Sequence, residues 1–239
     1  MNVIGISGYA RCGKDTFVGI ATNILKQNNY RPMRAAFADV LKDDIDPWLK
    51  DKYGISAWTE NLDEKKIIRP FLVAHGCGKR MQTEGKHWVD LVDKKITSVV
   101  EDCLENGETT DRIVALVSDV RFPNEAKWVR DEWGGEVIHL ARYSVQKWHP
   151  TVSDKTMNNY TPAEVDSLFN PLEFKHFDSA PNDEEATNDP LVLALSDQQI
   201  EWENRGKLTS AEAIENPYLQ EVVLAALNAT KLFNGTLSP

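Results

Sequence analysis

The expected fold is decided by one glycine-rich stretch, Gly8-Tyr9-Ala10-Arg11-Cys12-Gly13-Lys14-Asp15-Thr16. It nearly matches the G-x-x-x-x-G-K-[ST] pattern of a phosphate-binding loop. Glycines let successive backbone N–H groups turn toward phosphates, and the helix that follows directs its positive end to the same place. The lysine can bridge β- and γ-phosphate oxygens. The stretch therefore predicts a triphosphate site, whose candidate contacts are Gly8, Arg11, Cys12, Gly13, Lys14, Asp15 and Thr16.

Asp15 departs from this pattern, because a hydroxyl usually stands at its position. A carboxylate is also a good Mg²⁺ ligand, and Thr16 offers a hydroxyl one position later. Both residues are therefore candidate metal ligands. The alternative is a chance glycine-rich turn. The flanks disfavour it, since an apolar run at residues 3–6 predicts a buried strand and apolar residues at helical spacing over 17–25 predict a helix.

Apolar runs alternate with helical patterns over the first 140 residues, which predicts an α/β fold. Strands are expected at 3–6, 33–37, 113–117 and 137–140, and helices at 17–25, 40–52, 88–104 and 123–134. A further helix is expected to be capped by Asp63 and to stop near Gly76. We expect the three-layer P-loop fold, in which helices flank a mainly parallel central sheet.

The pattern is weaker beyond residue 141. Residues 142–154 are interpreted as a mobile lid, within a lid and loop region at about 142–160. Capping boxes predict helix starts at Thr161 and Thr209, and a last helix is expected from Pro217 to residue 232. The acidic stretch 181–190 is interpreted as a surface loop. One domain over residues 1–239 is the simplest interpretation, with a core at about 1–145 followed by a helical lid and C-terminal helices.

The overall charge is acidic, with 27 Lys and Arg against 37 Asp and Glu and a net charge of −10. Such a surface disfavours binding to nucleic acid polymers and to anionic membranes, but a few local cations can still bind a small anionic ligand. The three cysteines are too few and too scattered for a disulfide framework or a zinc site. With no signal peptide and no membrane-spanning stretch in the sequence, we expect a soluble cytoplasmic protein.

Three further constellations narrow the class of P-loop protein. In one of them, Arg69, Arg80 and Trp88 bracket a predicted helix end and a glycine-containing loop. Phe37-Ala38-Asp39-Val40-Leu41-Lys42 follows the second strand, and Ser118-Asp119-Val120-Arg121-Phe122-Pro123-Asn124-Glu125 follows the third. Asp119 thus occupies the place of a Walker B carboxylate. No N-K-x-D motif for guanine is present, and a motor ATPase needs a longer chain. A small kinase fits best.

Together with the Gly-Lys-Asp-Thr variant of the loop, these motifs resemble those of the bacteriophage deoxynucleoside monophosphate kinases. Members of that family tend to carry G-K-D-T, F-A-D-x-L-K and D-x-R-F-x-N-E in this order, and the resemblance covers about residues 1–150. It implies transfer of the ATP γ-phosphoryl group to a deoxynucleoside monophosphate with Mg²⁺, in the host cytoplasm. The partner is then a small nucleotide. The oligomeric state is open, with a homodimer as one option.

The resemblance also suggests roles for single residues. Lys14, Arg80 and Arg121 are the candidate catalytic residues, the two arginines because guanidinium groups suit the acceptor phosphate. Arg142 is a further ATP contact, and Asp15, Thr16 or Asp119 organise Mg²⁺. The candidate substrate contacts are Phe37, Asp39, Lys42, Arg69, Arg80, Trp88, Arg121 and Glu125. Phe37 or Trp88 is expected to stack on the base.

Each of these residues also has a structural alternative. Asp119 could cap a helix, Arg121 could pair with Glu125, and Arg69 could lie on a solvated helix face. Phe37 and Trp88 could belong to the core. Two alternative functions share the loop, namely another small-molecule kinase, such as a dephospho-coenzyme A or phosphomevalonate kinase, and a nucleotide-binding module without catalysis.

Overall fold

The computed structural model describes residues 1–148, 172–204, 206 and 210–238. Within them, six strands form one sheet in the order β2-β3-β1-β4-β5, with β6 also paired to β4. The strands are β1 (Asn2–Ser7), β2 (Arg31–Ala35), β3 (Ile113–Val120), β4 (Glu136–Trp148), β5 (Leu172–Phe177) and β6 (Gln198–Glu203). All pairings are parallel except that of β4 with β5. The predicted α/β fold with a mainly parallel central sheet is confirmed.

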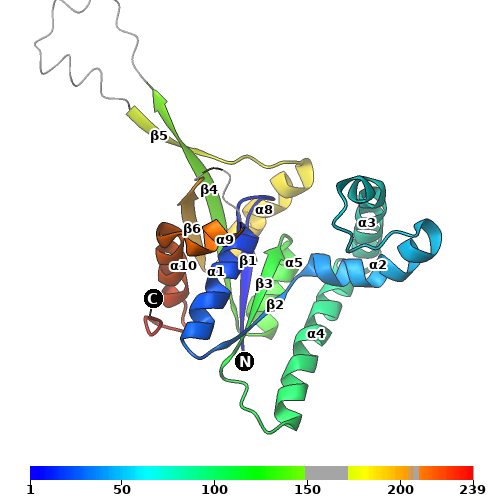
Figure 1. Ribbon diagram of the computed structural model, residues 1–239, viewed down its shortest axis with the longest axis horizontal. Coiled ribbons are helices and arrows are strands. Elements are labelled where there is room, and N and C mark those ends of the chain that lie inside the picture. Colours follow the sequence, from blue (N-terminus) through cyan, green and yellow to red (C-terminus); the bar gives the residue numbers. More distant parts are fainter. Residues whose placement is uncertain (149–171, 205, 207–209, 239) are drawn as a thin grey trace, which may run out of the picture.

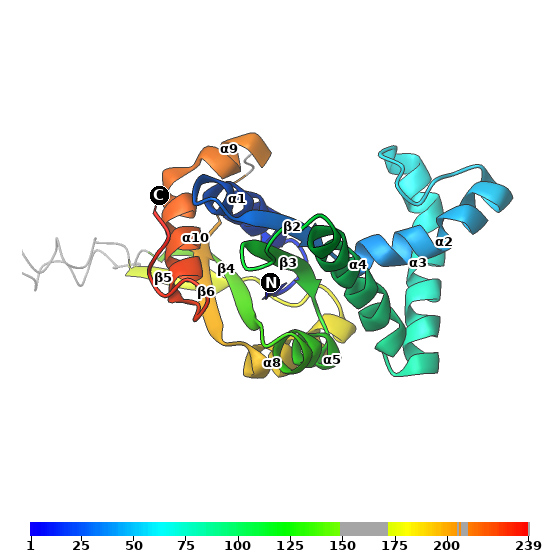
Figure 2. The ribbon, with the colours of Figure 1, turned by 90° about the horizontal axis from the view of Figure 1, so that it is seen from below.

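Helices cover both faces of this sheet and complete three layers. They are α1 (Lys14–Gln27), α2 (Phe37–Tyr53), α3 (Leu62–Thr83), α4 (Lys86–Glu105), α5 (Pro123–Lys127), the π-helical turn η1 (Trp128–Glu132), α8 (Asp183–Leu195), α9 (Ser210–Glu215) and α10 (Pro217–Ala229). Figure 2 shows α1, α9 and α10 on one side of the sheet, with α5 and α8 on the other. Among the described helices, none is both long enough and apolar enough to cross a membrane.

The central strands are apolar on both sides because both sides are covered. Along β3, Val114 and Leu116 pack into the core beneath α1 and α10, whereas Ala115 and Val117 pack beneath α4 and η1. Side chains alternate between the faces of a strand, so a strand between two helical layers has no polar face. This explains why the central strands stand out in the sequence as continuous apolar runs.

Helices α2 and α3 project from the edge of the sheet as a separate lobe (Figure 1). Their contact is a small core built around Ile45, Leu49, Ala57 and Ile68. The far half of β4 also leaves the body, where it pairs with β5 (Figure 1).

Helix α3 differs from its predicted limits at both ends. Its cap is Asn61 rather than Asp63, because the Asn61 side chain accepts from the backbone N–H of Asp63 at 2.9 Å. The helix also continues to Thr83 instead of stopping near Gly76. Close packing against α2 favours glycine at position 76, because a Cβ there would lie 2.7 Å from Leu41 Cδ1.

Two other predicted boundaries, one before α3 and one near the end of the chain, also shift. Strand β2 ends at Ala35, so Phe37, predicted as the end of that strand, is the first residue of α2. Helix α10 begins at Pro217 as predicted but ends at Ala229, three residues early.

The C-terminal half contains the larger corrections. Residues 142–148, predicted as part of a mobile lid, belong to β4. The rest of the predicted lid and the helix start at Thr161 lie outside the described residues. The predicted surface loop at 181–190 is wrong, because Asn182 caps α8 there. Strands β5 and β6 were not predicted, since polar and charged residues interrupt both and leave no apolar run.

We expect Gly78→Ala to stabilise the protein by about 0.5–1 kcal/mol, because alanine restricts the unfolded chain and favours helix. Nothing lies within 4 Å of a Cβ at Gly78, so the added methyl group meets no clash. The matched control is Gly76→Ala, whose Cβ would press on Leu41 and cancel the gain. Thermal unfolding measures both. A Gly78→Ala variant no more stable than the wild type would contradict a continuous α3.

Candidate functional site

The loop between β1 and α1 has the backbone conformation that its glycines permit. Gly8 and Gly13 have φ values of +123° and +102°, which residues with a side chain rarely adopt. Space requires glycine as well, because a Cβ at Gly8 would collide with the Leu140 carbonyl and one at Gly13 with the Trp202 ring. The two glycines thus let β4 and β6 pack directly against the loop.

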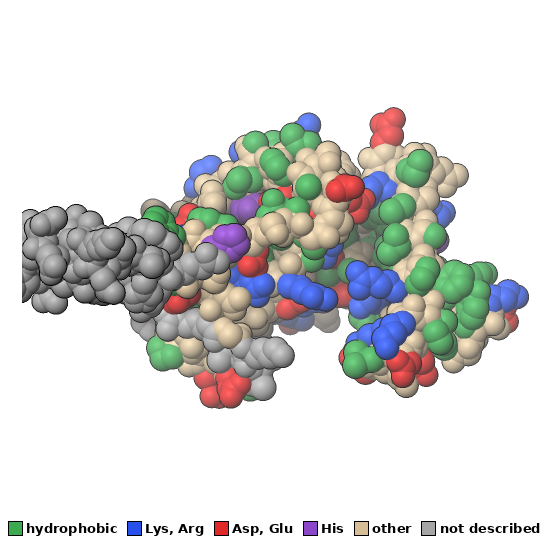
Figure 3. All heavy atoms as spheres, turned by 90° about the horizontal axis from the view of Figure 1, so that it is seen from above, with side chains coloured by type: hydrophobic (Ala, Val, Ile, Leu, Met, Phe, Trp, Pro, Cys, Tyr) green, Lys and Arg blue, Asp and Glu red, His purple; other side chains and the backbone are tan. Residues whose placement is uncertain are grey.

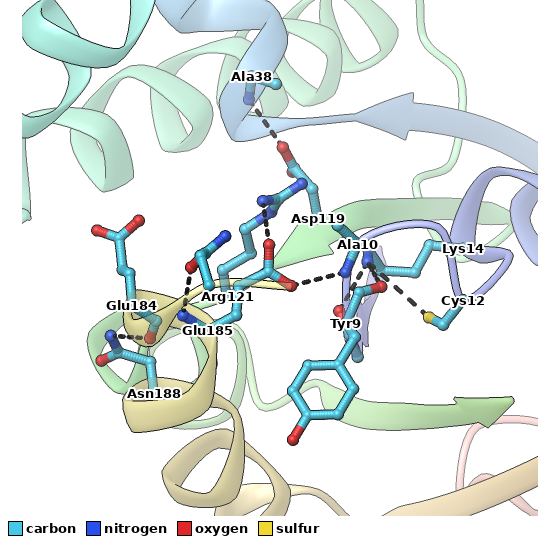
Figure 4. Close-up of polar contacts among 12 residues, drawn as sticks. Tyr9, Ala10, Cys12, Lys14, Ala38, Asp119, Arg121, Glu184, Glu185 and Asn188 are labelled. Atoms are coloured by element: carbon cyan, nitrogen blue, oxygen red, sulfur yellow. Dashed lines mark hydrogen bonds and ion pairs between the residues drawn. The ribbon is translucent and has the colours of Figure 1, made fainter. Parts of the chain in front are cut away.

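Lys14 begins α1 and folds its side chain back over this loop. Its Nζ donates to the carbonyls of Gly8 and Tyr9, both at 2.7 Å, and lies 3.9 Å from the buried Cys12 Sγ (Figure 4). Burial raises the pKa of the Cys12 thiol, which therefore stays neutral. An ammonium group held by neutral carbonyls keeps a full positive charge, and an anion would bind it more strongly than they do.

A cavity of about 350 Å³ lies beside the loop. Its charged lining consists of the cations Arg11, Lys14, Arg34, Lys42 and Arg121 and the carboxylates Asp15, Asp39 and Asp119. Lys and Arg side chains gather in the hollow between the sheet and the α2–α3 lobe (Figure 3). Cations thus outnumber carboxylates locally, although the chain as a whole carries a net charge of −10. The arrangement attracts a small polyanion.

Asp119 lies at the end of β3 and caps α2. Its two carboxylate oxygens accept from the backbone N–H groups of Phe37 and Ala38, both at 2.8 Å, and Figure 4 shows the contact with Ala38. Burial raises the pKa of Asp119, and these two hydrogen bonds offset part of that increase. The helix-capping alternative is therefore realised. Asp119 also lines the cavity, so its role toward a metal stays a prediction.

The three predicted metal ligands line the same cavity. Asp15 is exposed in the first turn of α1, next to Thr16, and Asp119 faces them from β3. In the described part of the chain, no three acidic, histidine or cysteine side chains form a metal cage. Mg²⁺ commonly binds through one or two carboxylates together with substrate phosphates. The oxygen donors present fit a metal ion held in that way.

Arg121 pairs with a residue that the sequence analysis did not consider. Its Nη1 donates to Glu185 of α8 at 3.2 Å, and the backbone N–H of Ala10 donates to the other oxygen of the same carboxylate at 2.7 Å (Figure 4). The predicted alternative, an ion pair of Arg121 with Glu125, is wrong. Glu125 accepts instead from the backbone N–H of Arg121, at 2.8 Å.

Glu125 is buried and holds the turn that carries Arg121. It accepts from the N–H groups of Arg121 and Phe122 and pairs with Arg80 at 2.7 Å. The Arg80 guanidinium lies over the Phe122 ring, 3.4 Å from its centre. Burial outweighs the attraction of Arg80 and raises the pKa of Glu125 to about 7. Neither Arg80 nor Glu125 lines the cavity beside the loop, so this pairing argues against their predicted contact with substrate.

The predicted base-stacking residues lie in the core, which corrects that prediction. Phe37 is 6% exposed and packs edge-on against Trp128, while Trp88 is 1% exposed and donates its indole N–H to the Gly76 carbonyl at 3.1 Å. Rings buried among side chains cannot stack on a ligand. Core packing, the alternative for both residues, is the role that the structure assigns.

Trp58 is an exposed aromatic residue near the cavity. It borders a second cavity of about 260 Å³, together with Lys42 and the exposed Arg69. Lys42 borders both cavities, and its Nζ lies 4.5 Å from the centre of the Trp58 ring. The two cavities therefore adjoin at Lys42.

Arg142 borders a third cavity, of about 190 Å³, on β4 next to Trp202 of β6. This cavity shares Arg11, Gly13 and Thr16 with the first. The Arg142 side chain is held by Asp178 at 2.6 Å. All the predicted ATP contacts except Gly8 thus line one or both of two cavities that meet at the loop.

Four residues near these cavities were not predicted from the sequence, namely Arg34, Trp58, Glu185 and Trp202. Arg34 pairs with Asp39, a predicted substrate contact, and lies 3.5 Å from Asp15. A tryptophan in the non-periodic segment between two helices is a signal that could have identified Trp58. Glu185 had no such signal, because nothing in its own stretch indicates the loop that it contacts.

Comparisons with known proteins add little. No protein-family model matches the chain, and no curated protein matches its sequence. Two solved shikimate kinases, from Aquifex aeolicus and Bacteroides thetaiotaomicron, are each 10% identical over 95% of this chain and 96% of theirs, with TM-scores of 0.33 and 0.37. The structure of TT1252 from Thermus thermophilus is 14% identical over 95% of this chain and 97% of its own, with a TM-score of 0.38. Because these scores are low, the fold assignment rests on the strand order itself.

Glu125 should make stability depend on pH. Its pKa of about 7 in the folded protein exceeds the ordinary value of 4.5, so the folded state holds a proton that the unfolded chain releases. Stability from this group is therefore present at low pH and is lost as pH rises from about 4.5 to about 7, by up to about 1 kcal/mol per pH unit.

Denaturant unfolding of the wild type and of Glu125→Gln at pH 5 and pH 7.5 measures this loss. Glutamine keeps an acceptor oxygen but does not titrate, so we expect the wild type to lose more stability than the variant across this range. Equal losses in the two proteins would show that Glu125 is ionised throughout.

Proposed function

We propose that the protein is an ATP-dependent kinase that transfers the γ-phosphoryl group to a deoxynucleoside monophosphate, giving the diphosphate and ADP. The observation that carries this proposal is the first cavity, where a phosphate loop and five cationic side chains face one space on an acidic protein. Cations brought so close repel one another, and a bound polyanion relieves that repulsion. The motif order, G-K-D-T, F-A-D-x-L-K and D-x-R-F-x-N-E, supports the nucleotide substrate.

The donor would lie along the first and third cavities. They share Arg11, Gly13 and Thr16, so a triphosphate at the loop can extend its nucleoside toward Arg142. A guanidinium group offers a flat cation for a nucleobase as well as donors for phosphate oxygens. A nucleoside placed in the third cavity, with its triphosphate at the loop, therefore fits ATP as the phosphoryl donor.

The acceptor would lie along the first and second cavities. Its phosphate would meet Arg121 and Lys42, and its base would reach Trp58, which is 43% exposed. The loop that carries Trp58 is held in place, because Asp46 accepts from the Ser56 hydroxyl at 2.7 Å and from the Ala57 N–H at 2.8 Å. A fixed aromatic ring can stack on a base at little entropic cost.

The transfer requires alignment of two anions and neutralisation of spreading negative charge. Lys14 and Arg121 supply positive charge on either side of the transferred group, and the loop backbone orients the donor. A monophosphate acceptor is already ionised at neutral pH, so the reaction needs no general base. Mg²⁺, held by Asp15, Thr16 or Asp119, would add charge neutralisation when bound.

Lys14→Ala should lower phosphoryl transfer by at least about a hundredfold, because it removes a charge that stabilises the transition state. A coupled assay of ADP release with each of the four deoxynucleoside monophosphates measures this. The control is Lys26→Ala, which removes a lysine from the last turn of the same helix. Transfer by the wild type to none of the four, but to another small acceptor, would indicate a different kinase. Tight ATP binding without transfer to any acceptor would indicate a binding module.

Trp58→Ala should raise the KM for the acceptor by about tenfold, because stacking of one base on an aromatic ring contributes about 1–3 kcal/mol. The KM for ATP should not change. Trp48→Ala is the matched control, since Trp48 is 44% exposed on the same lobe and borders neither cavity. An equal effect of both substitutions would refute a base site at Trp58.

A further inference from the structure

The Glu185 carboxylate makes the contacts that a phosphate group would make. One oxygen accepts from the backbone N–H of Ala10 in the phosphate loop at 2.7 Å, and the other pairs with Arg121 at 3.2 Å. Figure 4 shows the carboxylate between the loop and the guanidinium group. A loop N–H and an arginine are typical ligands of phosphate oxygens. Glu185 therefore behaves as an anionic ligand supplied by the chain itself.

Helix α8 fixes Glu185 in this position. The Asn182 side chain caps the helix by accepting from the Glu185 N–H at 2.9 Å. One turn further along α8, the Asp189 carboxylate Oδ2 lies 3.1 Å from the Nε2 atom of His139 in β4. Glu185 itself is only 8% exposed, whereas the neighbouring Glu184 is exposed to solvent. The contact with the loop is thus a packed feature of the fold and not a chance surface pair.

A phosphoryl group in the same place would compete with this carboxylate. Both need the Ala10 N–H and the Arg121 guanidinium, and both are negative. Two negative charges held this close repel strongly, because a protein surface screens charge less than bulk water does. The carboxylate and the phosphate therefore cannot both keep these contacts without a large electrostatic cost.

We propose that Glu185 is a built-in occupant of a phosphate position, and that a bound nucleotide has to displace its carboxylate from Ala10 and Arg121. The proposal rests on the proposed function in one respect, since it takes the loop as a triphosphate site. Displacement weakens nucleotide binding relative to what the loop and its cations allow. It also couples binding to α8, because the side chain that moves belongs to that helix.

Isothermal titration calorimetry with ATP and Mg²⁺ tests the proposal on the wild type, Glu185→Gln and Glu184→Gln. Glutamine at 185 keeps the shape and an acceptor oxygen for the Ala10 N–H but removes the charge. We expect Glu185→Gln to bind ATP about tenfold more tightly or better, as the repulsion disappears. Glu184→Gln removes the same charge from the neighbouring residue, which is exposed to solvent. We therefore expect this variant to bind ATP with wild-type affinity.

Unchanged or weaker ATP binding by folded Glu185→Gln would overturn the proposal, because it would mean that the carboxylate only positions Arg121. If that variant does not fold, Glu185→Ala serves in its place, with the same expected direction. The kinase assay separates the two proposals. Tighter binding by the variant, with no transfer to any deoxynucleoside monophosphate by the wild type, would support the role of Glu185 and contradict the function. No ATP binding by any folded protein would contradict both.

Discussion

The site depends on the close packing of the phosphate loop against the two strands beside it. Gly8 lies against the Leu140 carbonyl of β4 and Gly13 against the Trp202 ring of β6, and neither position has room for a side chain. Trp202 also donates its indole N–H to the Cys12 carbonyl at 2.8 Å. A strand from residues 198–203 therefore completes a loop formed near the start of the chain. The C-terminal part is needed for the geometry of the site as well as for covering the sheet.

The parts of the fold that could be predicted are those encoded by neighbouring residues. Strand β1, the loop and α1 follow one another directly, and the apolar runs of β3 and of the first half of β4 are local signals. The missed parts act over long separations, as where Glu185 meets Ala10, 175 residues earlier in the chain. Helix α3 continues through Gly76 because packing against Leu41 outweighs the low helix propensity of glycine. Sequence patterns do not report such tertiary contacts.

The candidate site divides in the same way. Lys14, Asp15, Thr16, Asp119 and Arg121 border one cavity, because the loop after β1 and the end of β3 lie side by side at the carboxyl edge of a parallel sheet. Their exact tasks were less predictable. Within one motif, Asp119 caps α2, Arg121 faces the cavity and Glu125 is buried beneath the turn. The spacing of charged residues in the sequence predicts that they lie close together in the fold. The burial of each side chain then decides whether it caps a helix, faces the cavity or supports a turn.

The cations at the first cavity are balanced by partners from several parts of the fold. Three of the cations at the cavity have partners that a phosphate could replace or rearrange: Lys14 has loop carbonyls, Arg34 has Asp39, and Arg121 has Glu185. A triphosphate carries more charge and more acceptor oxygens than any of these partners. Its binding would therefore replace these contacts with stronger ones. Because each exchanged partner belongs to a different element, namely the loop, α2 and α8, binding at one cavity would act on all three.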